Sequence, residues 1–344
     1  PLRSNSVDGR VSISPEIEGD ISLSEDMKQL IFTPKQAFEK NTEYKVTLLK
    51  GIENILGGYI EEDTILTFRT LGEVYISYAS PRNNSSNISI NTASIGITFN
   101  QPVDRSTVQE RFSVSPNISG TFSWSGNTLI YTFSQGLAYG TKYTFKISPG
   151  IKATYGIDSS STLSSSFTTK HETFTLDVPL FYQSESFTCN LAATRMVLSY
   201  KGVSSSENDI RSSIGIGSNP DTNWVEGYGV HWNPISTYIS SRGVSNTVKR
   251  GWNLNDALQE VKNGNPVLTY MYNGYSSPKG EFLLKGGYSA YKGMHSEVII
   301  GFVGTPQSPV SVITNDPWRG KRTHKVSSFN YLWSYLGNTA IVIY

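Results

Sequence analysis

The stretch "FSVSPNISGTFSWSGNTLIYTFS", residues 112–134, decides the layout of the N-terminal half, because a second version of it stands near the start of the chain. Residues 11–34 read "VSISPEIEGDISLSEDMKQLIFTP", in which Pro15 and Gly19 align with Pro116 and Gly120. Farther along, "NTEYKVTLLKGIENILGG" (41–58) matches "GTKYTFKISPGIKATYGI" (140–157). The first half therefore holds two copies of a unit of roughly 100 residues.

Both copies carry the pattern of β-strands. Tyr44, Val46 and Leu48 alternate with polar residues in the first copy, as do Tyr143 and Phe145 in the second. Gly, Pro, Asn and Asp separate these runs, and each copy closes with a Phe-x-Thr. Alternation with a period of two and frequent turn signals predicts a β-sandwich.

The shared pattern of the two copies resembles the bacterial Ig-like modules of surface-layer and other cell-envelope proteins. The resemblance implies a spacer or a binding arm, since such sandwiches serve many purposes. Pro1 aligns with Pro102, so residues 72–101, which contain two strand candidates, have no counterpart in the first copy. We therefore expect that the native protein continues upstream and that the first sandwich is incomplete and has an unpaired edge.

The second half has a different pattern, with helices followed by strands. We expect helices in "CNLAATRMVLSYKG" ending at Gly202, in "NPISTYISSRGV" with Asn233 as N-cap and Gly243 as terminator, and in "NLNDALQEVKNG" ending at Gly264. Strand candidates follow at 266–272, 296–303, 310–316 and 339–344. This order predicts an α+β domain. The expected domains are 1–71, 72–170 and 171–344.

Cys189 is the only cysteine of the 344 residues, so it is either an inert buried thiol or a nucleophile. It stands at the start of a predicted helix, where unpaired backbone N–H groups favour a thiolate. A nucleophile also needs an imidazole to take its proton and a third group to orient that imidazole. His295 opens one buried strand candidate and Asp316 ends the next, so the two could meet; Asn315 is the alternative partner.

The other three histidines are not expected to take part in catalysis. His231 precedes a predicted helix, and a packed or capping role is expected for it. His324 lies in the basic run "GKRTHK", which predicts a solvated turn, and His171 lies in the linker.

Three segments in order carry a second resemblance: "VPLFYQSESFTCNLAATRMVL", "GMHSEVIIGF" and "TNDPWRG". Together they resemble the papain-like cysteine peptidases of the bacteriocin-processing (double-glycine leader) type, and especially their stand-alone secreted or surface relatives. The resemblance implies that Cys189 attacks the scissile carbonyl, His295 transfers the proton and Asp316 orients the imidazole. It also implies that Gln183 and the Cys189 backbone N–H bind the oxyanion. The family usually has Cys-Gly-Pro-Ala, whereas this chain has Asn190 after the cysteine, which alters the wall beside the thiol.

Aromatic residues crowd the segments between these motifs and suggest a peptide groove. Residues 273–293 show neither helical nor strand period and predict a long loop leading to the site, of the kind that forms lids or subsite walls. The expected substrate-binding residues are Asn190, Trp224, Tyr228, Tyr288 and Tyr291.

The sequence thus predicts a bacterial secreted or cell-surface cysteine peptidase that acts on a peptide or protein. Its Ig-like modules would serve as spacer or as a binding arm for a cell-wall or surface ligand. The alternatives are a peptidoglycan amidase or endopeptidase of the same chemistry, an inactive adhesion protein, and a self-processing enzyme. No cofactor or metal site is expected, since the histidines are scattered and no Cys-x-x-Cys occurs. A net charge of +1 gives no case for nucleic acid, and no run approaches the roughly 18–20 apolar residues of a membrane span.

Overall fold

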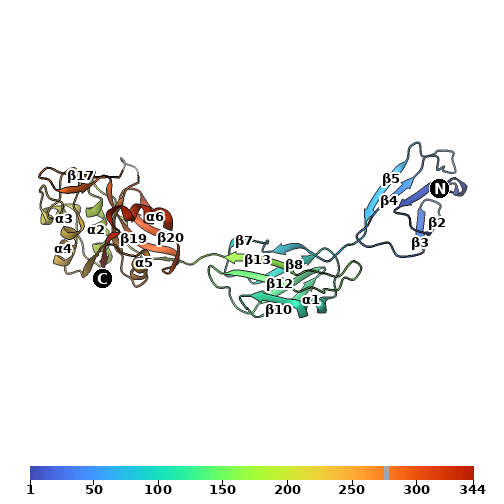
Figure 1. Cartoon of the computed structure of the whole chain (residues 1–344), viewed down its shortest axis with the longest axis horizontal. Helices are drawn as coiled ribbons and strands as arrows, with labels where there is room; N and C mark the ends of the chain where they lie inside the picture. The colour runs from blue at the N-terminus through green and yellow to red at the C-terminus, as the bar shows by residue number, and fades with distance from the viewer. Residues whose placement is uncertain (275–278) are drawn as a thin grey trace. The chain divides into compact units, whose positions relative to one another are not determined.

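The computed structural model describes residues 1–274 and 279–344 and divides the chain into two compact units, Pro1–Lys170 and His171–Tyr344. Figure 1 shows both units with their labelled elements. No helix among the described residues is long and apolar enough to cross a membrane.

Residues 72–170 form a sandwich of two four-stranded sheets, ordered β10-β11-β8-β6 and β7-β13-β12-β9. Alternate side chains of both sheets, such as Ile97, Leu129, Phe145 and Phe167, are buried between them. The elements are β6 (Ile76–Ser80), β7 (Ser85–Ile88), β8 (Ser94–Phe99), α1 (Arg105–Arg111), β9 (Phe112–Ser115), β10 (Gly120–Ser125), β11 (Thr128–Phe133), β12 (Lys142–Ile147) and β13 (Leu163–Thr169).

The first module repeats part of this arrangement. Its strands pair as β1-β4-β5 and β2-β3, which correspond in order and pairing to β9-β12-β13 and β10-β11 of the second module. Nothing in the first module corresponds to β6, β7 and β8. A short 3₁₀ turn, η1 (Ser4–Ser6), precedes the strands, which are β1 (Val11–Ser14), β2 (Gly19–Leu23), β3 (Leu30–Pro34), β4 (Glu43–Leu48) and β5 (Thr64–Arg69).

The missing strands leave apolar side chains of the first module in solvent. On β5, Ile65 is 52% exposed, Leu66 is 60% exposed and Phe68 is 40% exposed. Phe167, on the corresponding strand β13, is 1% exposed because β7 and β8 complete its sheets. The apolar side chains of the first module are therefore less completely buried than those at the corresponding positions of the second.

The C-terminal domain is built on one sheet, ordered β15-β22-β16-β19-β20-β21, with β14 pairing to β19. The strand pairs are antiparallel. The strands are β14 (Thr173–Thr175), β15 (Asn246–Lys249), β16 (Val267–Tyr272), β19 (Met294–Thr305), β20 (Ser308–Asp316), β21 (Gly320–Lys325) and β22 (Thr339–Ile343). All four strand candidates of the sequence are found here.

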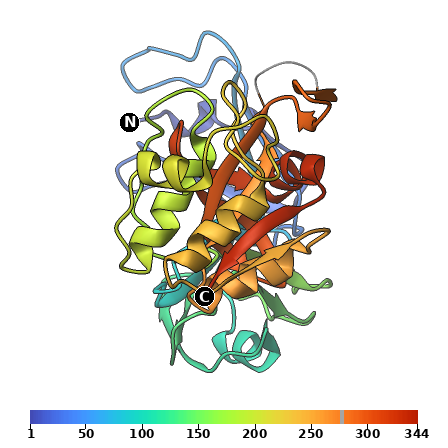
Figure 2. The same ribbon diagram turned by 90° about the vertical axis from the view of Figure 1, so that its left-hand side faces the viewer.

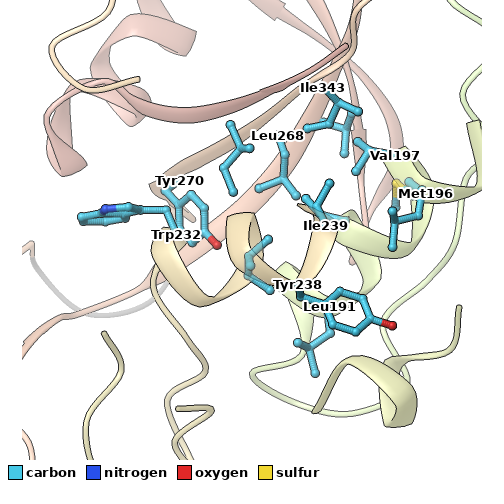
Figure 3. Close-up of a cluster of buried hydrophobic side chains, with 14 of the residues drawn as sticks. Leu191, Met196, Val197, Trp232, Tyr238, Ile239, Leu268, Tyr270 and Ile343 are labelled. Carbon is cyan, nitrogen blue, oxygen red and sulfur yellow. The ribbon is translucent and has the colours of Figure 1, made fainter. Parts of the chain in front are cut away.

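Helices bury both faces of this sheet, as Figure 2 shows for the domain facing the viewer. Alternation along β16 sends Leu268 and Tyr270 to one core and Val267 and Met271 to the other. In Figure 3 side chains of α2 and α4 meet those of β16 and β22 in the first core. The helices are α2 (Cys189–Tyr200), α3 (Glu207–Ile214), α4 (Trp232–Ser241), α5 (Leu254–Lys262) and α6 (Val326–Trp333), with the short turn η2 (Ser334–Leu336).

Two predictions about this domain were wrong in detail. The second predicted helix begins at Trp232 with His231 as N-cap, not at Asn233, because the backbone is already helical there; Pro234 is tolerated because first-turn N–H groups lack helical partners. The segment 273–293 is not all loop, since β17 (Glu281–Leu283) and β18 (Ser289–Tyr291) form a hairpin. Residues 275–278 of that segment lie outside the described residues.

Candidate active site

Cys189 is the first residue of α2 and is a free thiol with 6% of its surface exposed. The preceding Thr188 makes no side-chain cap to the helix; its hydroxyl donates to the carbonyl of Glu185 at 3.0 Å. The first turn of α2 therefore receives no side-chain cap from Thr188, and a helix N-terminus favours a nearby negative charge.

His295 and Asp316 come from neighbouring strands, β19 and β20. The imidazole Nε2 lies 2.8 Å from Oδ1 of Asp316, and the two side chains are 4% and 0% exposed. This contact occupies Nε2, and the Cys189 side chain also acts electrostatically on the imidazole. The three side chains thus come together from three separate elements, α2, β19 and β20.

The charges around the His295 imidazole stabilise its protonated form. Burial alone would lower the pKa of His295, but the negative charge of Cys189 and the hydrogen bond to Asp316 outweigh it and raise the pKa to about 10. Burial would likewise raise the pKa of Asp316, but its hydrogen bond to His295 and that cation's charge hold it below its usual value. A protonated imidazole beside an ionised Asp316 is the state that these shifts favour.

Asp316, and not Asn315, is the residue in contact with the imidazole. Neighbouring residues on a strand point to opposite faces of a sheet. Accordingly, Asn315 donates through Nδ2 to the carbonyl of Val178 at 2.9 Å, away from His295. Asp316 is fixed further by the backbone N–H of Trp318, which donates to Oδ1 at 2.8 Å.

Gln183 lines the same cavity as Cys189, although its side-chain amide donates elsewhere. Its backbone N–H donates to the carbonyl of Pro317 at 2.9 Å, which ties it to the segment after Asp316. Its Nε2 donates to the carbonyl of Glu185 at 2.8 Å, whereas its buried Oε1 has no hydrogen-bond partner among the described residues.

Cys189 and His295 open into a cavity of about 460 Å³. Its wall is mainly apolar and aromatic, and Lys292 is its one charged residue besides His295 within the described chain. The lining includes Gln183, Phe187, Tyr228, Phe282, Tyr291, Met294 and Trp318.

Comparison with known proteins assigns this domain. Residues 175–341 match the Peptidase_C39 like family. The C-terminal domain is a member of that family. Residues 1–70 and 73–169 match the bacterial Ig-like domain, which agrees with the two modules described above. The family places the C39-like domain among the papain-like peptidases.

Among curated proteins, an S-layer protein of Geobacillus stearothermophilus is 28% identical over 160 residues; the match covers 42% of this chain but only 13% of that protein. A putative C39-like peptidase from Bacillus anthracis has a TM-score of 0.44 and 19% identity, over 50% of this chain and 98% of the other. The peptidase domain of Streptococcus ComA has a TM-score of 0.30 and 18% identity, over 48% and 97%.

Two of the five predicted substrate-binding residues, Tyr228 and Tyr291, line the cavity of the C39-like domain. The other three do not. Asn190 is fully buried and donates through Nδ2 to the carbonyl of Val230 at 2.7 Å, so it supports the fold behind the thiol. Trp224 is buried in the core beneath the Arg211 guanidinium, and the partly exposed Tyr288 lies outside the lining.

The remaining three histidines do not line the cavity of Cys189 and His295. His231 is buried, as expected of a packed residue, and lies 2.8 Å from both Asp221 Oδ1 and the Tyr228 hydroxyl. The prediction of a solvated turn at His324 was wrong. His324 lies on β21 and is 6% exposed, because the alternation of the strand turns its side chain inward while its neighbours face solvent. His171 is exposed.

Sequence reasoning missed a set of charged residues behind Asp316. The buried Glu297 and the partly exposed Arg322 form an ion pair there, and Arg322 also contacts Asp316. One ligand-type atom each of His295, Glu297 and Asp316 lies within 4.8 Å of the others, a spacing that could suit a metal ion. The Arg322 guanidinium already pairs with both carboxylates, so the group does not resemble a cation site. The only sequence signal was the alternation of polar residues along β19 and β21.

Proposed function

We propose that this chain is a cysteine peptidase of the bacterial cell surface or extracellular space. Cys189 is the nucleophile, His295 the proton carrier and Asp316 the residue that orients the imidazole. The single observation that best supports this assignment is the grouping of the three side chains: Cys189 and His295 line one cavity, and His295 is hydrogen-bonded to Asp316.

The reaction follows from the charges of these groups. The Cys189 thiolate attacks the scissile carbonyl carbon, and the electron pair of the C=O bond moves to the oxygen. When the tetrahedral adduct collapses, the C–N bond breaks and the His295 imidazolium gives its proton to the leaving amine. Neutral His295 then removes a proton from water, which attacks the thioester and releases the acid product while Cys189 returns to a thiolate.

Gln183 and the backbone N–H of Cys189 are assigned to the oxyanion. Removing one such donor costs a factor of about 10²–10³ in rate in other acyl-transfer enzymes. The Gln183 amide carries a second N–H besides the one bonded to Glu185, so it can serve the oxyanion without breaking its present contact.

The cavity wall favours a substrate with large apolar side chains. Phe187, Phe282 and Trp318 present exposed aromatic surface at the cavity, and Tyr228 and Met294 extend the apolar wall. Burying such surface against an apolar side chain contributes roughly 25 cal/mol per Å². A polypeptide with Phe, Leu or Met next to the scissile bond fits this wall better than the small and acidic stem peptides of peptidoglycan.

The Ig-like modules and the S-layer relative support a place at the bacterial surface. At the surface, the modules would act as a spacer for the C39-like domain or as an arm that binds a cell-wall or surface ligand.

A peptide library assay tests the function. The full chain and its Cys189→Ala variant are incubated with a mixture of unmodified decapeptides, and new N-termini are identified by mass spectrometry. Cleavage next to large apolar residues by the wild type alone supports the proposal. Absence of cleavage by a protein that is correctly folded, or release of stem peptides from purified sacculi instead, contradicts it.

A further inference from the structure

Behind His295 and Asp316 the same sheet carries a second pair of charged residues, Glu297 and Arg322. Glu297 is two residues after His295 on β19, so both side chains leave the same face. Arg322 is on β21, two strands away, opposite Thr314 of β20. The Glu297 side chain is 2% exposed and that of Arg322 is 25% exposed.

Arg322 bridges the two carboxylates. Its Nη1 lies 3.0 Å from Oε1 of Glu297 and 3.2 Å from Oδ2 of Asp316. Oxygens of both carboxylates and a ring nitrogen of His295 lie within 4.8 Å of one another. Two buried carboxylates so close repel each other strongly unless a cation is between them. Arg322 therefore allows Asp316 to keep Oδ1 on the imidazole while Oδ2 is neutralised.

Glu297 is itself held on both sides. Its Oε2 accepts the Thr314 hydroxyl at 2.6 Å and lies 2.9 Å from Nε2 of His324. The position of Arg322 is thus fixed by a carboxylate that cannot rotate freely, and a buried network with its members satisfied is rigid.

We propose that Glu297 and Arg322 are positioning residues for the His295–Asp316 pair and set the charge balance at the imidazole. The consequence for turnover rests on the proposed function, but the charge balance does not. Among Asp316, Glu297 and Arg322 there is one net negative charge. Glu297→Gln removes it, Arg322→Gln doubles it, and the double variant restores it.

Other charges face the imidazole and remain constant in these variants. Cys189 faces it from α2 and Asp316 from β20, and Arg319, in the turn after β20, lies 3.5 Å from Oδ2 of Asp316. A change in the titration of His295 therefore reports the altered residue alone.

The test is the NMR titration of the full chain labelled with ¹⁵N-histidine, with the His295 resonance assigned through His295→Gln. Opposite charges within about 4–6 Å shift an ionisation by about 1–3 pH units. We expect the His295 midpoint to fall by about one unit or more in Glu297→Gln, to rise in Arg322→Gln, and to return near wild type in the double variant. Glu260→Gln, a remote glutamate whose carboxylate accepts from Asn265, is the matched control and should leave it unchanged.

Kinetics add a second readout: kcat should fall in both single variants while KM stays within about twofold. A His295 midpoint that is the same in Glu297→Gln and wild type overturns the inference, even if Arg322→Gln fails to fold and even if peptides are cleaved. A wild type that cleaves no peptide overturns the proposed function but leaves the titration result standing.

Discussion

The imidazole of His295 and the carboxylate of Asp316 lie 2.8 Å apart and are almost completely shielded from water, at 4% and 0% exposure. They belong to different strands, and their contact is set by the register in which β19 pairs with β20. Because Nε2 is held by Asp316, the other ring nitrogen remains for the thiol.

Asp316 and Asn315 can be distinguished by substitution. Asp316→Asn leaves an amide that cannot stabilise the imidazolium, and we expect kcat to fall by about 10²-fold or more. Asn315→Ala removes only the bond to the Val178 carbonyl and should lower the free energy of unfolding by about 1–3 kcal/mol with little effect on kcat. Steady-state kinetics and urea unfolding of both variants measure this; the reverse pattern would assign the role to Asn315.

Gln183→Ala separates oxyanion binding from the reactivity of the thiol. Peptide hydrolysis should lose about 10²–10³ in kcat, because the tetrahedral adduct loses a donor. Alkylation of Cys189 by iodoacetamide forms no oxyanion and should keep its wild-type rate. If both rates fall together, Gln183 acts by holding the loop before α2 instead.

Phe187 combines backbone strain with exposure in the cavity. It has φ of 68°, in a region that an aromatic residue rarely adopts, and it is 50% exposed two residues before Cys189. Phe187→Gly should therefore raise the free energy of unfolding by about 1 kcal/mol. It should also lower kcat/KM for peptides with Phe or Leu near the scissile bond about tenfold, with less effect on Gly-containing peptides.

Met27→Gly is the control for Phe187. Met27 has φ of 57° in the first Ig-like module and is 47% exposed. This variant should gain stability in its own module without any change in peptide selectivity. Equal selectivity in wild type and Phe187→Gly would show that Phe187 is not a specificity residue.

The raised pKa of His295 makes stability depend on pH. The pKa of His295 is about 10 in the folded protein and about 6.5 in the unfolded chain. Protonation of His295 therefore stabilises the fold fully below about pH 6.5, and this stabilisation is lost as the pH rises through about 10. The free energy of unfolding of the wild type should thus fall by about 2 kcal/mol or more between pH 7 and 10. In His295→Gln the fall should be clearly smaller, as urea unfolding across this range would measure.

Much of the fold could be predicted because it rests on local patterns. The alignments of 11–34 with 112–134 and of 41–58 with 140–157 predicted β-strands in both modules. Helix α2 begins at Cys189, as expected, and ends before Gly202, which has φ of 79°. The short strands β14 and β15 and the helices α3 and α6 were missed, since a few residues carry too little periodicity to stand out.

The grouping of Cys189, His295 and Asp316 could be predicted from the order of their motifs in the sequence. The charged network behind them could not. Contacts of Arg322 with Glu297 depend on which strands are neighbours and in what register, information that no single segment contains. The same reason explains the error at Asn190, a helix residue whose inward direction follows from packing against Val230.

The most direct test of the central claim is the rate of Cys189 alkylation by iodoacetamide from pH 4 to 9, compared between wild type and His295→Ala. We expect rapid alkylation of the wild type at pH 5–6 and its loss in the variant, which should follow the profile of an ordinary thiol with a midpoint at about pH 8.5. An ordinary thiol profile in both proteins would contradict the thiolate–imidazolium pair, and with it the assignment of Cys189 as a nucleophile.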